Sequence, residues 1–236
     1  MKISRSQTLV IHFIFDNLLP PVLRDADWLM RPILRMVFGK KAAIFFEWKE
    51  KAPSMDEVEF ARAYRDVEDV LIKRTTSVNE ACLDLIIQNM VGKNLLEVGC
   101  GNGFLSDLLS KRSETTAVDI IINPGIREVY PQIHFQEANM EKLPFPDQSF
   151  DTVVSTHTLE HVKNLTVAIC ELRRVTRTRL ILVTPRQRPY KYTFDLHLNF
   201  FPYPHSLLQA VGQSIGSSSC KVAGGDLFYM ESRLEN

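Results

Sequence analysis

The sequence predicts an α/β fold in which a seven-stranded, mostly parallel sheet carries helices on both faces and follows an N-terminal helical extension. Short apolar runs alternate with amphipathic segments from residue 94 to residue 185, as strands joined by crossover helices do. A loop with three glycines separates the first apolar run from the amphipathic segment after it. The last two apolar runs have no long segment between them, which predicts an antiparallel last strand at one edge of the sheet.

Length and composition narrow the class of protein. The chain has 236 residues, enough for one large domain with an extension. Lys+Arg and Asp+Glu both number 28, and this balance argues against nucleic acid as a partner. The four cysteines lie far apart without a C-x-x-C spacing, so we expect free thiols in the reducing cytoplasm and no metal site.

The first fifth of the chain differs from the rest in charge and aromatic content. Residues 1–51 hold nine basic and five acidic residues, and both tryptophans, with proline breaks that predict short helices. The apolar stretch at residues 8–23 is interrupted by His12, Asp16 and two prolines, so it is too broken to span a bilayer. No small-residue cleavage site follows it, so we expect no signal peptide.

Two longer helices are expected before the sheet begins. Ser54 and Ser77 each precede a glutamate by three residues, the spacing of a capping box, and predict two helix starts. Apolar residues recur after the first start as far as Ile72, and Gly92 predicts the end of the second helix. We therefore divide the chain into a helical extension or lid at residues 1–76 and a second domain at residues 77–236.

The second domain contains the predicted sheet. The expected helices cover residues 104–112, 125–130, 164–176 and 205–213. The expected strands cover residues 94–100, 115–121, 133–138, 150–156, 179–185, 219–223 and 227–232.

The glycine-rich stretch LLEVGCGNGFLSDLL, residues 95–109, lies at the carboxyl end of the first strand, where parallel sheets bind ligands. A P-loop is excluded because no Gly-Lys-Ser/Thr occurs. The dinucleotide pattern G-x-G-x-x-G would need a third glycine at position 104, which is Phe104. The remaining class is a nucleoside without pyrophosphate, since Glu97 at the strand end suits a ligand ammonium group better than a phosphate.

The glycine loop and three further motifs resemble one known family. EVGCGNG at residues 97–103 resembles the E/D-x-G-x-G-x-G motif of class I S-adenosylmethionine-dependent methyltransferases. LPFPDQSFD at 143–151, LEHV at 159–162 and ELRRV at 171–175 resemble the subfamily with an L-P-F-x-D-x-S-F-D run, methyltransferase type 11. The resemblance covers residues 77–185 and implies a Rossmann-like fold with S-adenosyl-L-methionine as cofactor.

The resemblance implies cofactor contacts at the first two strands. It places Glu97 near the methionine ammonium of the cofactor. It places the loop beside the methionine and ribose portions, through Gly99, Cys100, Gly101 and Gly103. Asp119 ends the second strand and matches the acidic residue that binds both ribose hydroxyls, with Ile120 next to it.

Further contacts are implied after the third and fourth strands. Asn139 stands where the family usually has Asp and would accept a hydrogen bond from the adenine amino group through its amide oxygen. Met140 would pack on the adenine ring. Thr156 and His157 would line the methyl-transfer side of the cofactor.

Methyl transfer is an in-line displacement, and a base is needed only when the acceptor is a hydroxyl or an acidic carbon. The candidate bases are His157, His161 and His197, each of which also has a plain structural interpretation. Tyr190, Tyr192 and Asp195 are second-rank candidates. The aromatic group around residues 190–203 is equally compatible with core packing and with a substrate-pocket wall.

The leading hypothesis is therefore an enzyme, a methyltransferase acting on a small, amphiphilic acceptor, with peripheral membrane contact through residues 1–50. The alternative is a non-catalytic module that binds S-adenosylmethionine or has lost it. A nicotinamide-dependent oxidoreductase is disfavoured by Phe104. The sequence leaves open the acceptor, the atom that is methylated and the oligomeric state.

Overall fold

The computed structural model describes residues 13–67, 70, 76–214 and 216–233. The chain divides into two compact units. The N-terminal unit comprises residues 1–74 and 187–200, and the sheet unit comprises residues 75–186 and 201–236. The segment 187–200, which the sequence pattern places in the second domain, thus groups with the N-terminal helices. In the described part of the chain, no helix has the length and apolar character needed to cross a membrane.

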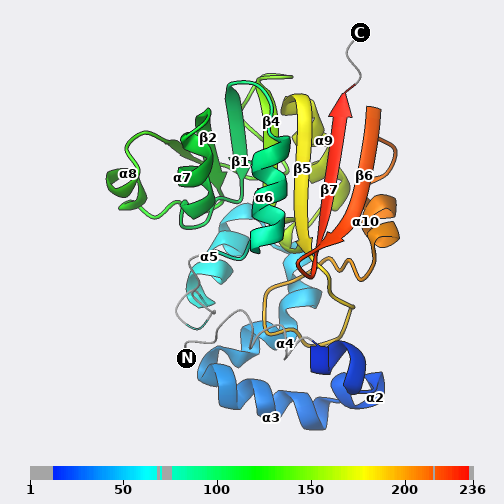
Figure 1. Cartoon of the computed structure of the whole chain (residues 1–236). Helices are drawn as coiled ribbons and strands as arrows, with labels where there is room; N and C mark the ends of the chain where they lie inside the picture. The colour runs from blue at the N-terminus through cyan, green and yellow to red at the C-terminus, as the bar shows by residue number, and fades with distance from the viewer. Residues whose placement is uncertain (1–12, 68–69, 71–75, 215, 234–236) are drawn as a thin grey trace. The chain divides into compact units, whose positions relative to one another are not determined.

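Short helices build the N-terminal unit, as predicted (Figure 1). They are η1 (Ile14–Leu18), α2 (Pro21–Arg24), α3 (Asp27–Phe38), η2 (Gly39–Lys41), α4 (Ala42–Lys51), η3 (Ala52–Ser54) and α5 (Glu57–Val67). Pro21 is the first residue of α2, where its missing N–H costs no hydrogen bond. The described residues begin at 13, so part of the apolar stretch 8–23 lies outside them.

The irregular segment 187–200 is held to these helices through its backbone carbonyl groups. The buried Trp48 donates from Nε1 to the Leu196 carbonyl oxygen at 2.9 Å, and Lys49 donates to the Tyr190 carbonyl oxygen. Tyr190 and Tyr192 are themselves buried. Much of the aromatic group at 190–203 is therefore packed in the core of this unit.

The two predicted capping boxes are wrong in position. Ser54 lies in η3, and the reciprocal cap of α5 joins Asp56 and Glu59 instead, with hydrogen bonds of 2.8 and 3.1 Å. In the sheet unit, α6 (Glu80–Asn89) is capped by Asn79, whose Oδ1 accepts from the Cys82 N–H. Both helices still have a side-chain acceptor for the free N–H groups of their first turn, because Asp and Asn cap at least as well as Ser. The helix α6 ends at Asn89, three residues before Gly92.

All seven predicted strands are present and form one sheet, with the order β3-β2-β1-β4-β5-β7-β6. They are β1 (Asn94–Val98), β2 (Glu114–Asp119), β3 (His134–Glu137), β4 (Phe150–Thr156), β5 (Thr176–Pro185), β6 (Gly216–Ala223) and β7 (Asp226–Arg233). The first five strands run parallel, and β7 pairs antiparallel with both β5 and β6.

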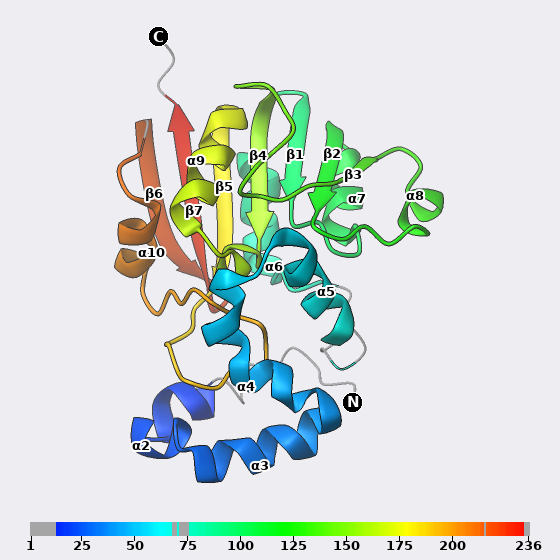
Figure 2. The same ribbon diagram turned by 180° about the vertical axis from the view of Figure 1, so that it is seen from behind.

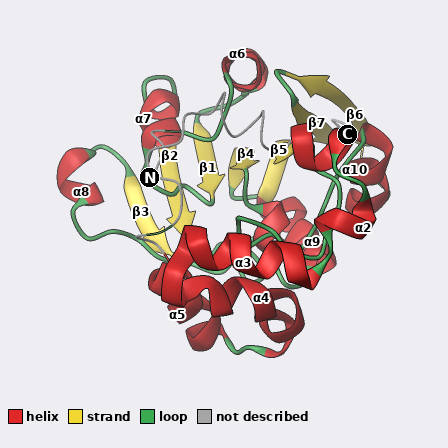
Figure 3. Ribbon diagram, turned by 90° about the horizontal axis from the view of Figure 1, so that it is seen from below, coloured by secondary structure: helices red, strands yellow, loops and turns green. Residues whose placement is uncertain are grey.

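Helices cover both faces of this sheet. They are α6, α7 (Phe104–Ser110), α8 (Ile126–Val129), α9 (Leu165–Val175) and α10 (Pro204–Val211). The helices α6 and α7 lie on one face and α9 on the other (Figures 2 and 3). Alternate strand residues divide accordingly, since Leu95 and Val154 pack with α6 and α7, whereas Leu96 and Val153 pack with α9.

The strand register sets the position of the candidate site. Val98 is paired with Val118 of β2 on one side and with Ser155 of β4 on the other. The carboxyl ends of β1, β2 and β4 therefore lie level at one edge of the sheet, the edge at which parallel sheets bind ligands.

Candidate functional site

The glycine loop after β1 is held by hydrogen bonds to the end of β2. The N–H groups of Gly99 and Cys100 both donate to the Val118 carbonyl oxygen, at 2.8 and 3.1 Å. Gly99, Gly101 and Gly103 all have positive φ angles, +84°, +53° and +78°. A Cβ on Gly99 would lie 2.0 Å from Thr158 Oγ1, whereas no described atom comes within 4 Å of a Cβ on Gly101. A side chain at position 99 would therefore collide with Thr158, whereas the loop is open at Gly101, where space for a side chain or a ligand is free.

Glu97 lies one residue before the end of β1 and is only 2% exposed. Its Oε2 accepts a hydrogen bond from the hydroxyl of Ser106, which belongs to α7. Burial raises the pKa of Glu97 to about 8, with a further contribution from the neighbouring Asp119 and against the hydrogen bond from Ser106. The site thus holds a buried acid that is largely neutral at pH 7 and that a nearby cation would ionise.

Asp119 ends β2, as predicted, and its carboxylate is fixed by backbone N–H groups. Oδ2 accepts from Gly101 at 2.8 Å and Oδ1 accepts from Ile120 at 2.7 Å. Burial raises the pKa of Asp119, while these hydrogen bonds and the nearby His161 lower it. Asp119 and the glycine loop are thereby locked to one another, and Ile120 shares in the same turn.

Asn139 and Met140 follow β3, next to the end of β2, since the Ala138 N–H donates to the Asp119 carbonyl oxygen at 2.9 Å. The amide oxygen of Asn139 accepts from the Glu141 N–H at 2.9 Å. The oxygen that we expect to meet adenine therefore already has one donor. Met140 is buried in the core cluster that contains Val118.

Thr156 is buried at the end of β4, and His157 follows it with a left-handed backbone, φ +51°. The His157 ring lies between Asp226 and Glu160, with nitrogen–oxygen distances of 3.2 and 3.6 Å. Burial alone would lower the pKa of His157, but the two carboxylates outweigh it and raise the pKa to about 9. His157 is therefore protonated at neutral pH and is a poor proton acceptor.

The other two histidine candidates belong to different units of the chain. His161 ends the turn Leu159–His161 in the sheet unit and interacts with the Asp119 carboxyl. His197 belongs to the N-terminal unit, where it is buried with Nδ1 2.6 Å from Gln187 Oε1. Tyr192 belongs to that unit as well and donates to Asp27 at 2.8 Å.

Sequence reasoning missed four polar residues of this region. Ser106 contacts Glu97, Thr158 packs on Gly99, and Glu160 and Asp226 flank His157. Ser106 carries a usable signal, because it is a small polar residue in the first turn of the helix that follows the glycine loop. Asp226 carries none, since it lies 69 residues after His157 in the chain.

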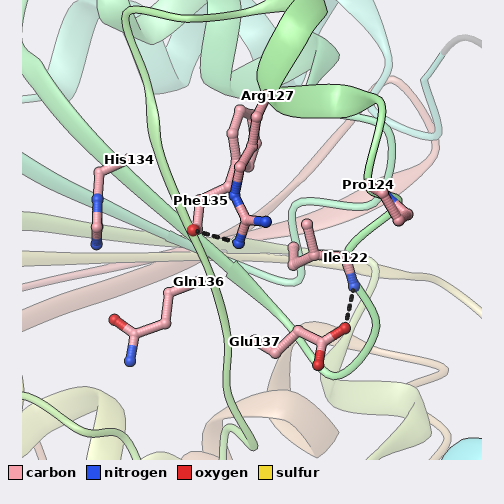
Figure 4. A pocket seen from close by; sticks show the side chains of 7 residues that line it. All are labelled: Ile122, Pro124, Arg127, His134, Phe135, Gln136 and Glu137. Atoms are coloured by element: carbon pink, nitrogen blue, oxygen red, sulfur yellow. Dashed lines mark hydrogen bonds between the residues drawn. The ribbon is translucent and has the colours of Figure 1, made fainter.

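A hollow of about 540 Å³ lies along the edge strand β3 (Figure 4). Arg127 donates to the Phe135 carbonyl oxygen at 3.1 Å there, and Ile122 N–H donates to Glu137 at 3.1 Å. None of the predicted cofactor residues lines this hollow.

A mostly parallel sheet with a glycine loop, a buried acid and a strand-end aspartate at one edge is the arrangement of nucleotide-binding α/β folds. Residues 96–183 match the family described as methyltransferase domain. This segment is similar to class I S-adenosylmethionine-dependent methyltransferases, proteins whose cofactor is S-adenosyl-L-methionine. The residues fit this cofactor, because Glu97 offers an ionisable carboxyl on the strand that leads into the glycine loop, and the loop has free space at Gly101.

Similar proteins support this assignment. The chain is 28% identical over 128 residues to a probable S-adenosylmethionine-dependent methyltransferase of Mycolicibacterium smegmatis, covering 52% of this chain and 50% of that protein. It is 28% identical over 130 residues to a ubiquinone biosynthesis O-methyltransferase of Dechloromonas aromatica, covering 50% and 56%. The chain thus spans about half the length of these relatives.

A solved structure shows the likeness of fold. The crystal structure of a protein from Pyrococcus horikoshii superposes with a TM-score of 0.52, covering 73% of this chain and 92% of that one, at 19% identity. Together with the strand order, it shows a Rossmann-like sheet with antiparallel last strands.

Proposed function

We propose that this protein is an enzyme that transfers the methyl group of S-adenosylmethionine to a small acceptor. The observation that carries the proposal is the buried, neutral Glu97 next to a loop that is open over Gly101. A buried acid with a raised pKa is suited to a ligand that brings its own positive charge. The cofactor, when bound, supplies both the reactive methyl carbon and the leaving group.

The protein's own part is to hold and orient. We assign Glu97 to the methionine ammonium of the cofactor and Asp119, fixed by two backbone N–H groups, to its ribose hydroxyls. The assignment of Asn139 and Met140 to the adenine ring, and of Thr156 to the methyl-transfer side, completes the proposed contacts. Close and correct placement of the acceptor then supplies much of the rate enhancement.

Of the three candidate bases, we favour His161 for an acceptor that must lose a proton. His157 is disfavoured because its two carboxylate partners keep it protonated. His161 lies in the same turn and interacts with Asp119, a proposed cofactor residue. A His161→Gln variant should lose methyl transfer and keep cofactor binding, and unchanged transfer would exclude this role.

A small-molecule acceptor is supported by the relative named for ubiquinone biosynthesis. We propose further that the acceptor is amphiphilic and that the N-terminal unit contacts an anionic lipid surface. The helix α3 buries Met30, Leu34 and Phe38 on one face.

The opposite face of α3 presents Trp28 and Met36, which are 71% and 81% exposed, two helical turns apart. Arg31 and Arg35 are exposed beside them. An exposed apolar face flanked by cations is typical of helices that lie in a membrane interface.

Two experiments test these proposals separately. Calorimetry with S-adenosylmethionine and with its demethylated product should show binding, and binding of neither would overturn the cofactor assignment and the enzyme proposal together. A labelled-cofactor screen of small acceptors then tests transfer.

For membrane contact, the intact protein should bind phosphatidylcholine vesicles that contain phosphatidylglycerol more tightly than vesicles without it. A Trp28→Ser/Met36→Ser variant should lose this binding, and Val129→Ser, an exposed position on α8, is the control. Equal binding by both variants would exclude α3 as the contact.

A further inference from the structure

The His157 ring is the centre of a buried ionic cluster at the end of β4. Nε2 is 3.2 Å from Asp226 Oδ2 and Nδ1 is 3.6 Å from Glu160 Oε1, and the His157 side chain is 15% exposed. A neutral imidazole has one N–H and one lone pair, so one nitrogen would point its lone pair at a carboxylate. Both nitrogens face carboxylate oxygens here, which favours the doubly protonated ring.

Asp226 connects this ring to two other parts of the sheet unit. It is the first residue of β7, and its Oδ2 also accepts from Asn79 Nδ2 at 2.8 Å. Asn79 is the N-cap of α6 and donates to the Ala223 carbonyl oxygen at the end of β6 as well. A Cβ on Gly224 would lie 2.2 Å from Asn79 Oδ1, so the β6–β7 turn closes directly over this side chain.

The backbone of His157 is held in a conformation that non-glycine residues seldom adopt. Its φ is +51°, and Gln148 is the only other non-glycine residue with positive φ among those that the structure describes. Such a conformation is strained and persists where the surroundings impose it. Here the ring is held by Asp226 and Glu160, and the N–H donates to the Val183 carbonyl oxygen of β5 at 2.8 Å.

Thr158, the residue after His157, connects the turn to the glycine loop. Thr158 Oγ1 donates to the Thr156 carbonyl oxygen at 3.0 Å. The same Oγ1 lies where a side chain on Gly99 would begin, 2.0 Å from the Cβ position. The turn after β4 therefore forms the wall behind the glycine loop, and a displacement of His157 would move that wall.

We propose that His157 is a positioning residue, a cation clamped between Asp226 and Glu160 that fixes the turn at 157–161 against Gly99 and so sets the shape of the cofactor loop. The effect on cofactor binding rests on the proposed function. The effect of His157 on the turn and on the glycine loop can be measured without cofactor. It gives the β6–β7 turn and the start of α6 a direct effect on cofactor binding, although neither contains a predicted cofactor residue.

The test compares His157→Gln, which keeps a hydrogen-bonding side chain but no charge, with Asp226→Asn and with the wild type. The matched control is His134→Gln, because His134 is an exposed histidine of β3. Nitrogen NMR of the His157 ring should show two N–H groups at pH 7.5 in the wild type and a neutral ring in Asp226→Asn. A neutral ring in the wild type would overturn the clamped-cation model.

The consequence for the loop is measured by hydrogen exchange without cofactor. The N–H groups of Gly99 and Cys100 should exchange about tenfold faster in His157→Gln and in Asp226→Asn, and at the wild-type rate in His134→Gln. Unchanged exchange in both cluster variants would overturn the proposal.

Calorimetry with S-adenosylhomocysteine then separates this inference from the proposed function. His157→Gln should bind about tenfold more weakly than the wild type, and His134→Gln should bind like the wild type. If the wild type itself does not bind, the proposed function fails, whereas the NMR and exchange results still decide whether the clamp exists. Far-ultraviolet circular dichroism shows whether His157→Gln is folded. If that variant is unfolded, Asp226→Asn is compared with the wild type in its place.

Discussion

The raised pKa of Glu97 predicts that cofactor binding releases a proton. With a pKa of about 8, the Glu97 carboxyl is about nine-tenths protonated at pH 7. The ammonium group of the bound cofactor favours the carboxylate, so Glu97 ionises on binding. We therefore expect the release of about 0.9 proton per cofactor at pH 7, and an affinity that rises about tenfold per pH unit between pH 6 and 7.

The ionisation of Glu97 makes cofactor binding modestly weaker at pH 7. Ionising a group whose pKa is one unit above the pH takes about 1.4 kcal/mol from the binding free energy. Since that cost falls as the pH approaches 8, binding tightens with rising pH. The trend ends near pH 8, where the α-amino group of the cofactor itself begins to lose its proton.

Calorimetry in buffers of different ionisation enthalpy measures the protons released. The observed enthalpy of S-adenosylhomocysteine binding at pH 7 should change with buffer enthalpy with a slope of about one proton. The control is Glu97→Gln, which has a similar shape but cannot ionise, and which should remove most of the slope. A slope near zero in the wild type, or an unchanged slope in Glu97→Gln, would refute the reasoning.

Three further predictions concern stability. The pKa of Glu97 is about 8 in the folded protein, against an ordinary value of 4.5, so the folded protein binds more protons than the unfolded chain between these pH values. The urea midpoint of the wild type should therefore fall as the pH rises from 5 to 8. The fall should be smaller in Glu97→Gln, and an equal fall in that variant would contradict the assignment. Gly99→Ala should lower the free energy of unfolding in urea by more than about 2 kcal/mol, because the new Cβ would collide with Thr158 Oγ1. Gly101→Ala should lower it by about 1–2 kcal/mol, because only the positive φ of that residue opposes a side chain. Equal losses would show that Thr158 does not pack tightly against Gly99. Arg173→Met should cost about 3–5 kcal/mol, because Glu231 is 2% exposed and would lose a charged partner at 2.7 Å, and a loss below 1 kcal/mol would mean that Glu231 is neutral.

Much of the fold follows from local pattern. The alternation of apolar runs and amphipathic segments predicted all seven strands, since a buried strand of a parallel sheet is a short run of apolar residues that are neighbours in the sequence. The capping boxes failed for a related reason. Several Ser, Asp and Asn residues near each helix start are chemically competent caps, and only the packed helix selects Asp56 and Asn79.

The candidate site was predicted as a set of positions and not as a set of charge states. Glu97 and Asp119 lie close to level strand ends because the register pairs Val98 with Val118. The ionisation of Glu97 depends on burial beneath α7, and that of His157 on Asp226, which no sequence pattern connects with it.

By itself, the sequence determined the type of sheet, the glycine loop and the cofactor that belongs to the family, because these depend on short motifs whose residues are close in the chain. Only the tertiary structure decided the charge state of His157, the wall that Thr158 forms behind Gly99, and the grouping of residues 187–200 with the N-terminal helices. The physical reason is that pKa values, close contacts and domain grouping depend on burial and on partners that are distant in sequence, and folding alone brings those together.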